Sequence, residues 1–201
     1  ALQNGRDTIA ITSFTNTSAN AIADKAFEVA AGNQMALVPR RNISTLHSFG
    51  YRAVRDDGTV VALDPAVLGD WNSHAPHEWR ITSDNRKSTP DMAVDTGMLG
   101  GDGEVTEASN GDQMLAALDM ARATLTPERE WPPARRAFAE RWNDWKRDSS
   151  ALDFGDMIHG ALDQALDGEP APGHPEVFIV DEAQDMTPAE FALALAWMRH
   201  P

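Results

Sequence analysis

Cysteine is absent from this 201-residue sequence, which excludes disulfide bonds and metal sites that use thiolate ligands. No run of about 18 apolar residues is present, so we expect no membrane-spanning helix and no membrane partner. The first residues lack the basic and then apolar pattern of a secretory signal peptide. These absences fit a protein of a reducing compartment, and we expect an intracellular, cytoplasmic location.

Basic side chains are scarce, because 17 lysines and arginines face 31 acidic residues and give a net charge of −14. This charge argues against a general nucleic-acid binder, since contacts to phosphates need cationic side chains. The balance differs along the chain, and residues 1–60 carry six basic and five acidic side chains. If any part contacts a nucleic acid, these sixty residues are the better candidate, and the acidic remainder provides solubility.

The apolar residues that are present alternate between short β-rich runs and helical periodicity. We predict strands at residues 8–12, 43–47 and 177–180, and helices at residues 19–30, 48–55, 112–125, 153–166 and 188–199, with one more helix starting at Pro132 and Pro133. The side chains of Asn16, Thr17 and Ser18 offer caps for the first helix. Residues 59–111 are poorly patterned and predict an irregular insertion or a partly mobile stretch. The alternation of strands and helices predicts an α/β fold with a parallel sheet.

Three segments carry expectations about burial. Residues 177–180 are apolar without alternation, which is typical of a strand buried on both faces of a parallel sheet. The helix at 188–199 is apolar nearly all round, so much of it is expected to be buried. Phe138, Trp142 and Trp145 share one helical face, which favours core packing over a platform for stacking bases.

Adjacent carboxylates follow the third predicted strand, at Asp181 and Glu182. The carboxyl edge of an open α/β sheet is where ligands bind. Asp181 can hold Mg²⁺ directly or through water, and Glu182 can orient and deprotonate an attacking water. Gln184 is a neutral donor and acceptor suited to sensing a γ-phosphate. In the alternative interpretation, Asp181 only ends a strand and Glu182 is a solvated turn residue.

Four segments resemble, in the same order, motifs of the UvrD/Rep-like helicases of superfamily 1. They are residues 12–19 (Thr-Ser-Phe-Thr-Asn-Thr-Ser-Ala), 43–52 (Ile-Ser-Thr-Leu-His-Ser-Phe-Gly-Tyr-Arg), 152–158 (Leu-Asp-Phe-Gly-Asp-Met-Ile) and 179–185 (Ile-Val-Asp-Glu-Ala-Gln-Asp). The first is similar to motif Ia, usually a Thr-Phe-Thr-Asn-Lys-Ala-Ala run, and the second to the Thr-x-His-Ser-Phe segment. The third is similar to the Asp-Phe-x-Asp-Leu-Leu segment, and the last to the Walker B motif.

The resemblance implies an ATP-dependent DNA helicase with a RecA-like parallel sheet flanked by helices. Residues 1–58 and 151–201 would form an incomplete N-terminal motor domain, truncated at both ends. Residues 59–150 would form an inserted, mostly helical and partly irregular subdomain. A protein of this kind would be bacterial or phage-encoded and would couple hydrolysis of Mg-ATP to movement on single-stranded DNA.

The resemblance also implies a role for each matched residue. Asp181 would coordinate the Mg²⁺ of Mg-ATP, Glu182 would be the catalytic base, and Gln184 would contact the γ-phosphate. The residues implied to bind single-stranded DNA are Phe14, Thr15, Asn16, Thr45, His47 and Ser48. Each has a simpler interpretation, since Phe14 suits a core, Asn16 suits a helix cap and His47 suits a buried, hydrogen-bonded histidine.

The sequence departs from the family at two points. It contains no Gly-Lys-Thr or Gly-Lys-Ser phosphate loop, and Thr17 stands where motif Ia usually has lysine. We expect the phosphate loop upstream and the second motor domain downstream in the same polypeptide, and this chain alone to hydrolyse ATP poorly or not at all.

Two other functions fit the same residues. A Mg²⁺-dependent nuclease or hydrolase would use Asp181, Glu182 and Asp185 around one ion, although the turn before the helix at 188–199 makes that convergence awkward. A non-catalytic, ATPase-like scaffold would bind no nucleotide even with the upstream sequence restored.

Overall fold

The computed structural model describes residues 9–33, 38–82 and 109–199, and the chain divides into two compact units. Unit 1 comprises Ala1–Arg55 and Asp156–Pro201, and unit 2 comprises Asp56–Gly155. Within the described ranges, no helix combines the length and the apolar character needed to cross a bilayer.

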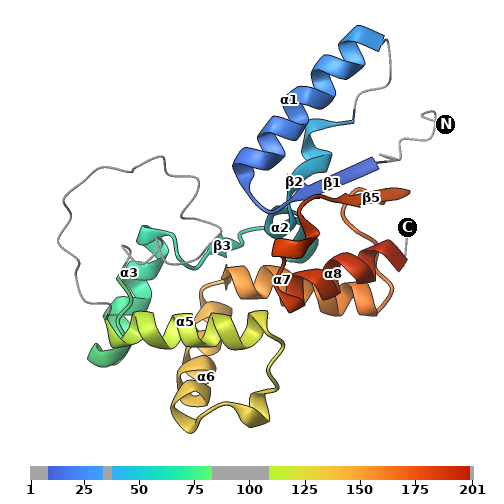
Figure 1. Ribbon diagram of the computed structural model, residues 1–201. Helices are drawn as coiled ribbons and strands as arrows, with labels where there is room; N and C mark the ends of the chain where they lie inside the picture. The colour runs from blue at the N-terminus through green and yellow to red at the C-terminus, as the bar shows by residue number, and fades with distance from the viewer. Residues whose placement is uncertain (1–8, 34–37, 83–108, 200–201) are drawn as a thin grey trace. The chain divides into compact units, whose positions relative to one another are not determined.

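A three-stranded parallel sheet lies at the centre of unit 1 (Figure 1). Strand β1 (Ile9–Ser13) lies between β2 (Ile43–Thr45) and β5 (Val177–Val180), so the spatial order is β2-β1-β5. Ile11 is in register with both Ile43 and Ile179. Because all three strands run in the same direction, their carboxyl ends meet at one edge of the sheet.

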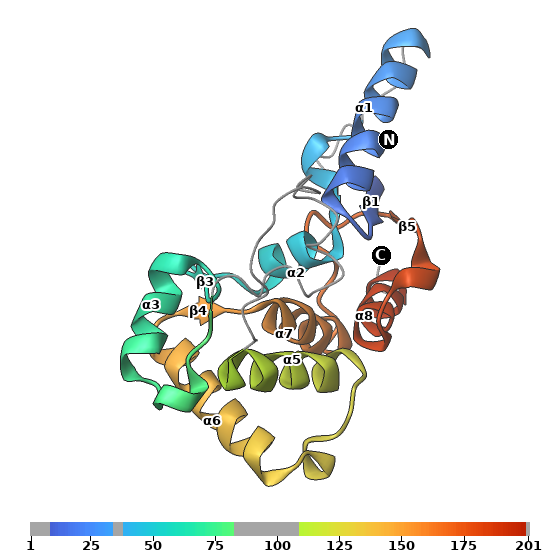
Figure 2. The same ribbon diagram turned by 60° about the vertical axis from the view of Figure 1, so that its left-hand side comes forward.

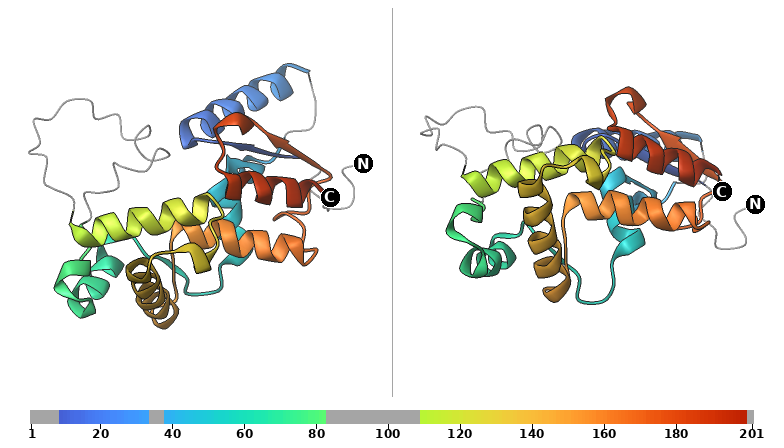
Figure 3. Two further views of the ribbon diagram at one scale, coloured as in Figure 1. Left: turned by 60° about the horizontal axis from the view of Figure 1, so that its bottom comes forward. Right: turned by 90° about the horizontal axis from the view of Figure 1, so that it is seen from below.

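Helices cover the two faces of this sheet. Helix α1 (Asn16–Asn33) packs on one face, over β1 and β2. On the opposite face lie α2 (Leu46–Val54), α8 (Pro188–Arg199) and α7 (Phe154–Leu166), whose residues from Asp156 onward belong to unit 1 (Figures 1 and 3). The predicted α/β class, a parallel sheet flanked by helices, is confirmed.

The core of unit 1 forms between the sheet and the second helical layer. Its buried members are Ala10, Leu46, Phe49, Ile158, Ala161, Leu162, Ala165, Ala171, Ala189, Leu193, Ala196 and Trp197. The ring of Phe49 meets those of Phe178 and Trp197 edge-on or nearly so, with centroids 5.6 and 6.4 Å apart. Edge-to-face pairs of this kind add to the stabilisation that burial of apolar area provides.

The expectation that residues 177–180 are buried on both faces is wrong. Phe178 packs against the core, whereas Val177 and Ile179 are 48% and 43% exposed. The alternation of side chains places these two residues on the face that α1 covers. Helix α1 lies over β1 and β2, so β5 at the edge of the described sheet keeps one open face.

Much of the last helix is buried, as expected, but only along one side. Leu193 and Trp197 of α8 enter the core, but Phe191, Leu195 and Met198 are exposed along the other side. A helix that packs on a sheet from one side buries only one stripe, whatever the polarity of its remaining residues.

In its described residues, unit 2 contains a pair of short parallel strands, packed with the helices named below (Figure 2). The strands are β3 (Val60–Val61) and β4 (Ala151–Leu152). The helices are α3 (Pro65–His74), α5 (Asn110–Ala123) and α6 (Pro133–Asp148). Single turns of 3₁₀-helix lie at His77–Trp79 and Glu128–Glu130, as others do in unit 1 at Arg40–Asn42 and Ala183–Asp185.

Helix α3 lies within the segment that we expected to be irregular, so that expectation is wrong for residues 65–74. Asp64 caps the helix by accepting a hydrogen bond from the backbone of Ala66, and Pro65 occupies its first turn. Leu68 and Trp71 then supply the buried side. The remainder of the segment includes residues 83–108, which lie outside the described residues.

The aromatic stripe of α6 packs in the core of unit 2, as predicted. Phe138 and Trp142 are fully buried. Trp71 contacts Trp142 edge-on, with centroids 4.9 Å apart, and Trp145 stacks on Trp142 at 4.8 Å. These rings are used for packing within the unit, which leaves the stripe unsuited to stack on bases.

Candidate functional site

The carboxyl edge of the unit 1 sheet gathers the ends of three chain segments. β1 ends at Ser13, β2 ends at Thr45, and β5 is followed directly by Asp181. Ser13 is in register with Thr45. The backbone N–H of Asp181 donates to the carbonyl of Thr12 at 2.8 Å, which continues the β1–β5 ladder by one residue.

The carboxylate of Asp181 is held by a neighbouring strand. Its Oδ2 accepts a hydrogen bond from the hydroxyl of Ser13 at 3.1 Å. Both residues follow the alternation of their strands and share a face with Ile11 and Ile179. Asp181 is half-buried, and Oδ1 makes no hydrogen bond to the described part of the chain.

Glu182 occupies an unusual backbone conformation. Its φ of 56° and ψ of 39° are left-handed, although it is not glycine, and it precedes the 3₁₀ turn Ala183–Asp185. A left-handed residue of this kind costs about 1–3 kcal/mol and is frequent at functional sites. This conformation turns the chain directly after β5. The carboxylate of Glu182 is exposed, and its Oε2 accepts a hydrogen bond from the side chain of Gln184.

The N-terminal cap of α1 is none of the three residues expected to offer it, Asn16, Thr17 and Ser18. Thr15 is the cap, because its Oγ1 accepts from the backbone N–H of Ser18 at 3.0 Å. Asn16 is the first helical residue and is exposed, and Phe14 is half-buried at the bend between β1 and α1. Residues 14–16 therefore form the tight turn that connects β1 to α1 at the carboxyl edge of the sheet.

A second threonine caps the helix after β2. Oγ1 of Thr45 accepts from the backbone N–H of Ser48 at 3.3 Å, and the two hydroxyls lie 3.0 Å apart. This cap starts α2 at Leu46, so His47 is helical and our prediction of a strand at 46–47 is wrong. Thr45 and Ser48 are thereby brought together at the same edge as Asp181.

Glu190 contacts His47 and was not among the residues that the sequence singled out for function. It completes the predicted capping box of α8, with its Oε2 accepting from the backbone N–H and the hydroxyl of Thr187, each at 2.8 Å. Its Oε1 lies 3.6 Å from Nδ1 of His47. The buried carboxylate of Glu190 thus contacts both Thr187, in the turn before α8, and His47 of α2. Only the capping pattern was visible in the sequence, because the histidine is 143 positions away in the chain.

Positive charge gathers at the far end of α2. The guanidinium of Arg52 lies over the ring of Phe49 at 4.2 Å and donates through Nη1 to the carbonyl of Arg41 at 2.5 Å. Burial lowers the pKa of Arg52, and the nearby charges of Arg55 and Arg41 lower it further. Arg41, Arg52 and Arg55 therefore form a small cationic cluster in unit 1.

The donor set at Asp181 fits a magnesium ion that is shared with a phosphate. Mg²⁺ in nucleotide sites is bound by one or two carboxylates together with phosphate oxygens and water. Oδ2 of Asp181 is oriented by Ser13, while Oδ1 remains available. Among the described residues, no group of three histidines or carboxylates could hold a metal ion by itself. Asp181, Glu182 and Asp185 do not form such a group in the described residues.

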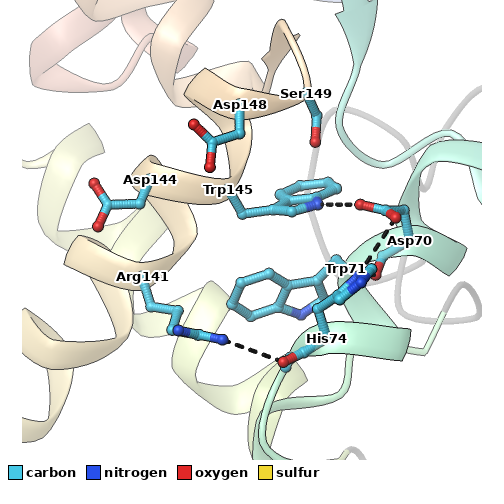
Figure 4. A pocket seen from close by; sticks show the side chains of 9 residues that line it. Asp70, Trp71, His74, Arg141, Asp144, Trp145, Asp148 and Ser149 are labelled. Carbon is cyan, nitrogen blue, oxygen red and sulfur yellow. Dashed lines mark hydrogen bonds and ion pairs between the residues drawn. The ribbon is translucent and has the colours of Figure 1, made fainter.

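A separate groove lies in unit 2, between α3 and α6 (Figure 4). It encloses about 430 Å³ and is lined by Asp70, Trp71, His74, Ala75, Arg141, Asp144, Trp145, Asp148 and Ser149. Nε1 of Trp145 donates to Asp70 at 2.8 Å, and Arg141 donates to the carbonyl of His74 at 3.2 Å. These contacts tie the two helices together across the groove.

Comparison with protein families identifies one match that covers nearly the whole chain. The sequence model of the UvrD/REP helicase N-terminal domain matches residues 2–199. A comparison with curated proteins gave no match.

Proposed function

The chain belongs to the UvrD/REP helicase N-terminal domain family, and we propose that it forms part of a motor that couples hydrolysis of Mg-ATP to movement on single-stranded DNA. One observation carries the proposal. Asp181 and Glu182 follow β5 at the same sheet edge from which β1 leads into Phe14 and β2 leads into His47. Two sets of side chains with different chemistry therefore lie at one edge of the sheet, and this proximity supports coupling between a nucleotide and DNA.

The acidic pair supplies the nucleotide chemistry in this proposal. Asp181 binds the Mg²⁺ of Mg-ATP through the carboxylate that Ser13 orients. Such an ion neutralises charge on the β- and γ-phosphates when it is bound. Glu182, exposed beyond the strand end, accepts the proton of the attacking water, a contribution of ~10²–10⁴ in rate. The side chain of Gln184 donates a hydrogen bond to the carboxylate of Glu182. If Gln184 bonded to a γ-phosphate instead, the carboxylate of Glu182 would be free to act as the base.

The two capped connections supply the DNA contacts. Phe14, half-buried at the end of β1, can stack on a base, which is worth ~1–3 kcal/mol. Thr15 and Asn16 begin α1, while Thr45, His47 and Ser48 begin α2. Backbone N–H groups and short hydroxyls at helix starts are common partners of phosphate oxygens.

The remaining parts of the motor are proposed to come from the rest of the same polypeptide. The phosphate loop would grip the β- and γ-phosphates opposite Asp181, and a second motor domain would complete the site. Unit 1 corresponds to the ATPase core in this proposal, and unit 2 to the inserted subdomain. We propose that the whole protein acts inside a bacterial or phage-infected cell.

Strand separation by the full-length protein tests this function. A labelled strand annealed to a longer one should be released when ATP and Mg²⁺ are both present. Glu182→Gln should abolish release while retaining DNA binding, because only the base is lost. Glu176→Gln, an exposed carboxylate just before β5, is the matched control and should behave as wild type. Cleavage of the DNA with Mg²⁺ and no nucleotide would instead support the nuclease alternative.

A further inference from the structure

We propose that Ser13 is a positioning residue that fixes the carboxylate of Asp181 for its metal ion. The proposal rests on the nucleotide role of Asp181 given above and adds a residue from a different strand to that site. Ser13 directly precedes Phe14, which is proposed to bind DNA, but its own hydroxyl contacts Asp181.

Register and alternation bring the two side chains together. Thr12 is paired with Val180, so the next residues along, Ser13 and Asp181, lie opposite each other. Both project to the face that carries Ile11. The resulting hydroxyl-to-carboxylate distance is 3.1 Å, within the range of a hydrogen bond.

Burial of Ser13 favours the hydrogen bond from its hydroxyl to Asp181. Ser13 is 1% exposed, so water cannot readily satisfy its side chain. A buried hydroxyl without a partner is costly, and the carboxylate of Asp181 is the acceptor that the structure provides. Bonds to a charged acceptor are also stronger than those between neutral groups.

The hydrogen bond from Ser13 also determines the direction of Oδ1, the other oxygen of the Asp181 carboxylate. With Oδ2 held by Ser13, rotation of the carboxylate about its last bond is restricted and Oδ1 is directed to one place. Partners that orient a ligating carboxylate typically contribute 10–100-fold to metal affinity. Loss of the Ser13 hydroxyl should therefore weaken metal binding without removing a ligand.

Metal binding, measured directly, tests the proposal. Mn²⁺ is titrated into full-length protein carrying Glu182→Gln, with ATP present, and free Mn²⁺ is followed by electron paramagnetic resonance. Ser13→Ala should weaken Mn²⁺ binding by about 10-fold, the lower part of the range for such partners. Ser13→Thr, which keeps the hydroxyl, should restore it. Ser44→Ala, a serine of the neighbouring strand, is the matched control and should leave binding unchanged.

A double-mutant cycle separates positioning from general damage to the fold. In protein that also carries Asp181→Asn, Ser13→Ala should have no further effect on Mn²⁺ affinity. An equal effect in both backgrounds would overturn the proposal. If Ser13→Ala does not fold, Ser13→Cys replaces it, because a thiol is a much weaker donor.

The outcomes distinguish this inference from the function on which it rests. If wild-type protein binds Mn²⁺ with ATP and Ser13→Ala binds it equally well, only the role of Ser13 is overturned. If the protein with intact Ser13 and Asp181 shows no ATP-dependent Mn²⁺ binding, both the role of Ser13 and the proposed function are overturned.

Discussion

Nζ of Lys146 lies 2.6 Å from Oδ2 of Asp153, and both side chains are buried in unit 2. The same oxygen accepts a hydrogen bond from Nε1 of Trp142 at 2.7 Å, and Nη1 of Arg122 lies 3.2 Å away. Asp153 belongs to a segment that resembles a helicase motif, yet its contacts are those of a structural anchor. It fixes the end of β4 to the helices α5 and α6.

Lys146→Met should therefore destabilise the protein strongly. Removing one partner of a buried ion pair typically costs ~3–5 kcal/mol, because the other charge stays buried. Because Arg122 still neutralises part of the charge of Asp153, the loss of stability should lie at the lower end of this range. The free energy of unfolding, measured with urea, checks this. Lys25→Met breaks an exposed pair with Glu28 and should cost less than ~1 kcal/mol. Equal losses for the two variants would contradict the role given to Asp153.

Acid should remove part of the stability of unit 2. Burial alone would raise the pKa of Asp153, but the charges of Lys146 and Arg122 and the bonds from Lys146 and Trp142 lower it well below its usual range. The unfolded chain takes up this proton below pH ~4 and the folded chain only at much lower pH. The stabilisation is therefore complete above pH ~4 and declines as the pH falls through the depressed pKa.

Urea unfolding between pH 2 and 6 measures this loss. Asp153→Asn should be less stable at pH 6 and should show a smaller decline towards pH 2 than the wild type. Asp144→Asn, which removes an exposed carboxylate paired with Arg147, is the control and should keep the wild-type slope. An unchanged slope in Asp153→Asn would show that other groups govern acid unfolding.

Gly50→Ala should destabilise unit 1. A Cβ at this position would lie 2.2 Å from the backbone carbonyl oxygen of Met157, so α2 and α7 would have to separate. Overpacking of this kind typically costs ~1–3 kcal/mol. Gly69→Ala in α3 meets nothing within 4 Å and should instead stabilise by roughly 0.5–1 kcal/mol, because alanine favours the helix. Opposite signs of the two changes in unfolding free energy are the expected result.

The first helix of unit 1 offers a test of which residue caps it. Thr15→Ala should cost about 1 kcal/mol, because Thr15 accepts the backbone bond from Ser18. Asn16→Ala should stay within ~0.5 kcal/mol, since Asn16 is an exposed first residue of the helix. If Asn16, one of the three residues offered by the sequence, were the cap, the order would be reversed, and urea unfolding of the two variants distinguishes the two cases.

Much of the unit 1 fold was predictable because its signals are local. The apolar run at 177–180, the short strand before Phe14 and the capping box at Thr187 each identify an element from neighbouring residues. The order of the sheet and the open face of β5 depend on which helix reaches which strand, and periodicity carries no such information. Helix α3 was missed although Asp64 and Pro65 are a usual helix start, because the helix is only ten residues long and its apolar residues show little helical periodicity.

The candidate site was predictable as a set of residues but not as a set of contacts. Asp181, Glu182 and Gln184 were named from their position after a strand, and their assigned roles stay predictions. The bond from Ser13 and the approach of His47 to Glu190 join residues more than 140 positions apart. Such pairs depend on strand register and helix placement, which the sequence of either segment alone does not specify. The assignment of residues 59–150 to an inserted subdomain likewise stays a prediction.

Hydrolysis of ATP by the full-length protein, with and without Glu182→Gln, tests whether Glu182 is the catalytic base. Single-stranded DNA should stimulate hydrolysis by the wild type, and the variant should bind ATP but hydrolyse it at least ~10² times more slowly. An equal hydrolysis rate in the two proteins would contradict this prediction, because Glu182 could then not be the base at the end of β5.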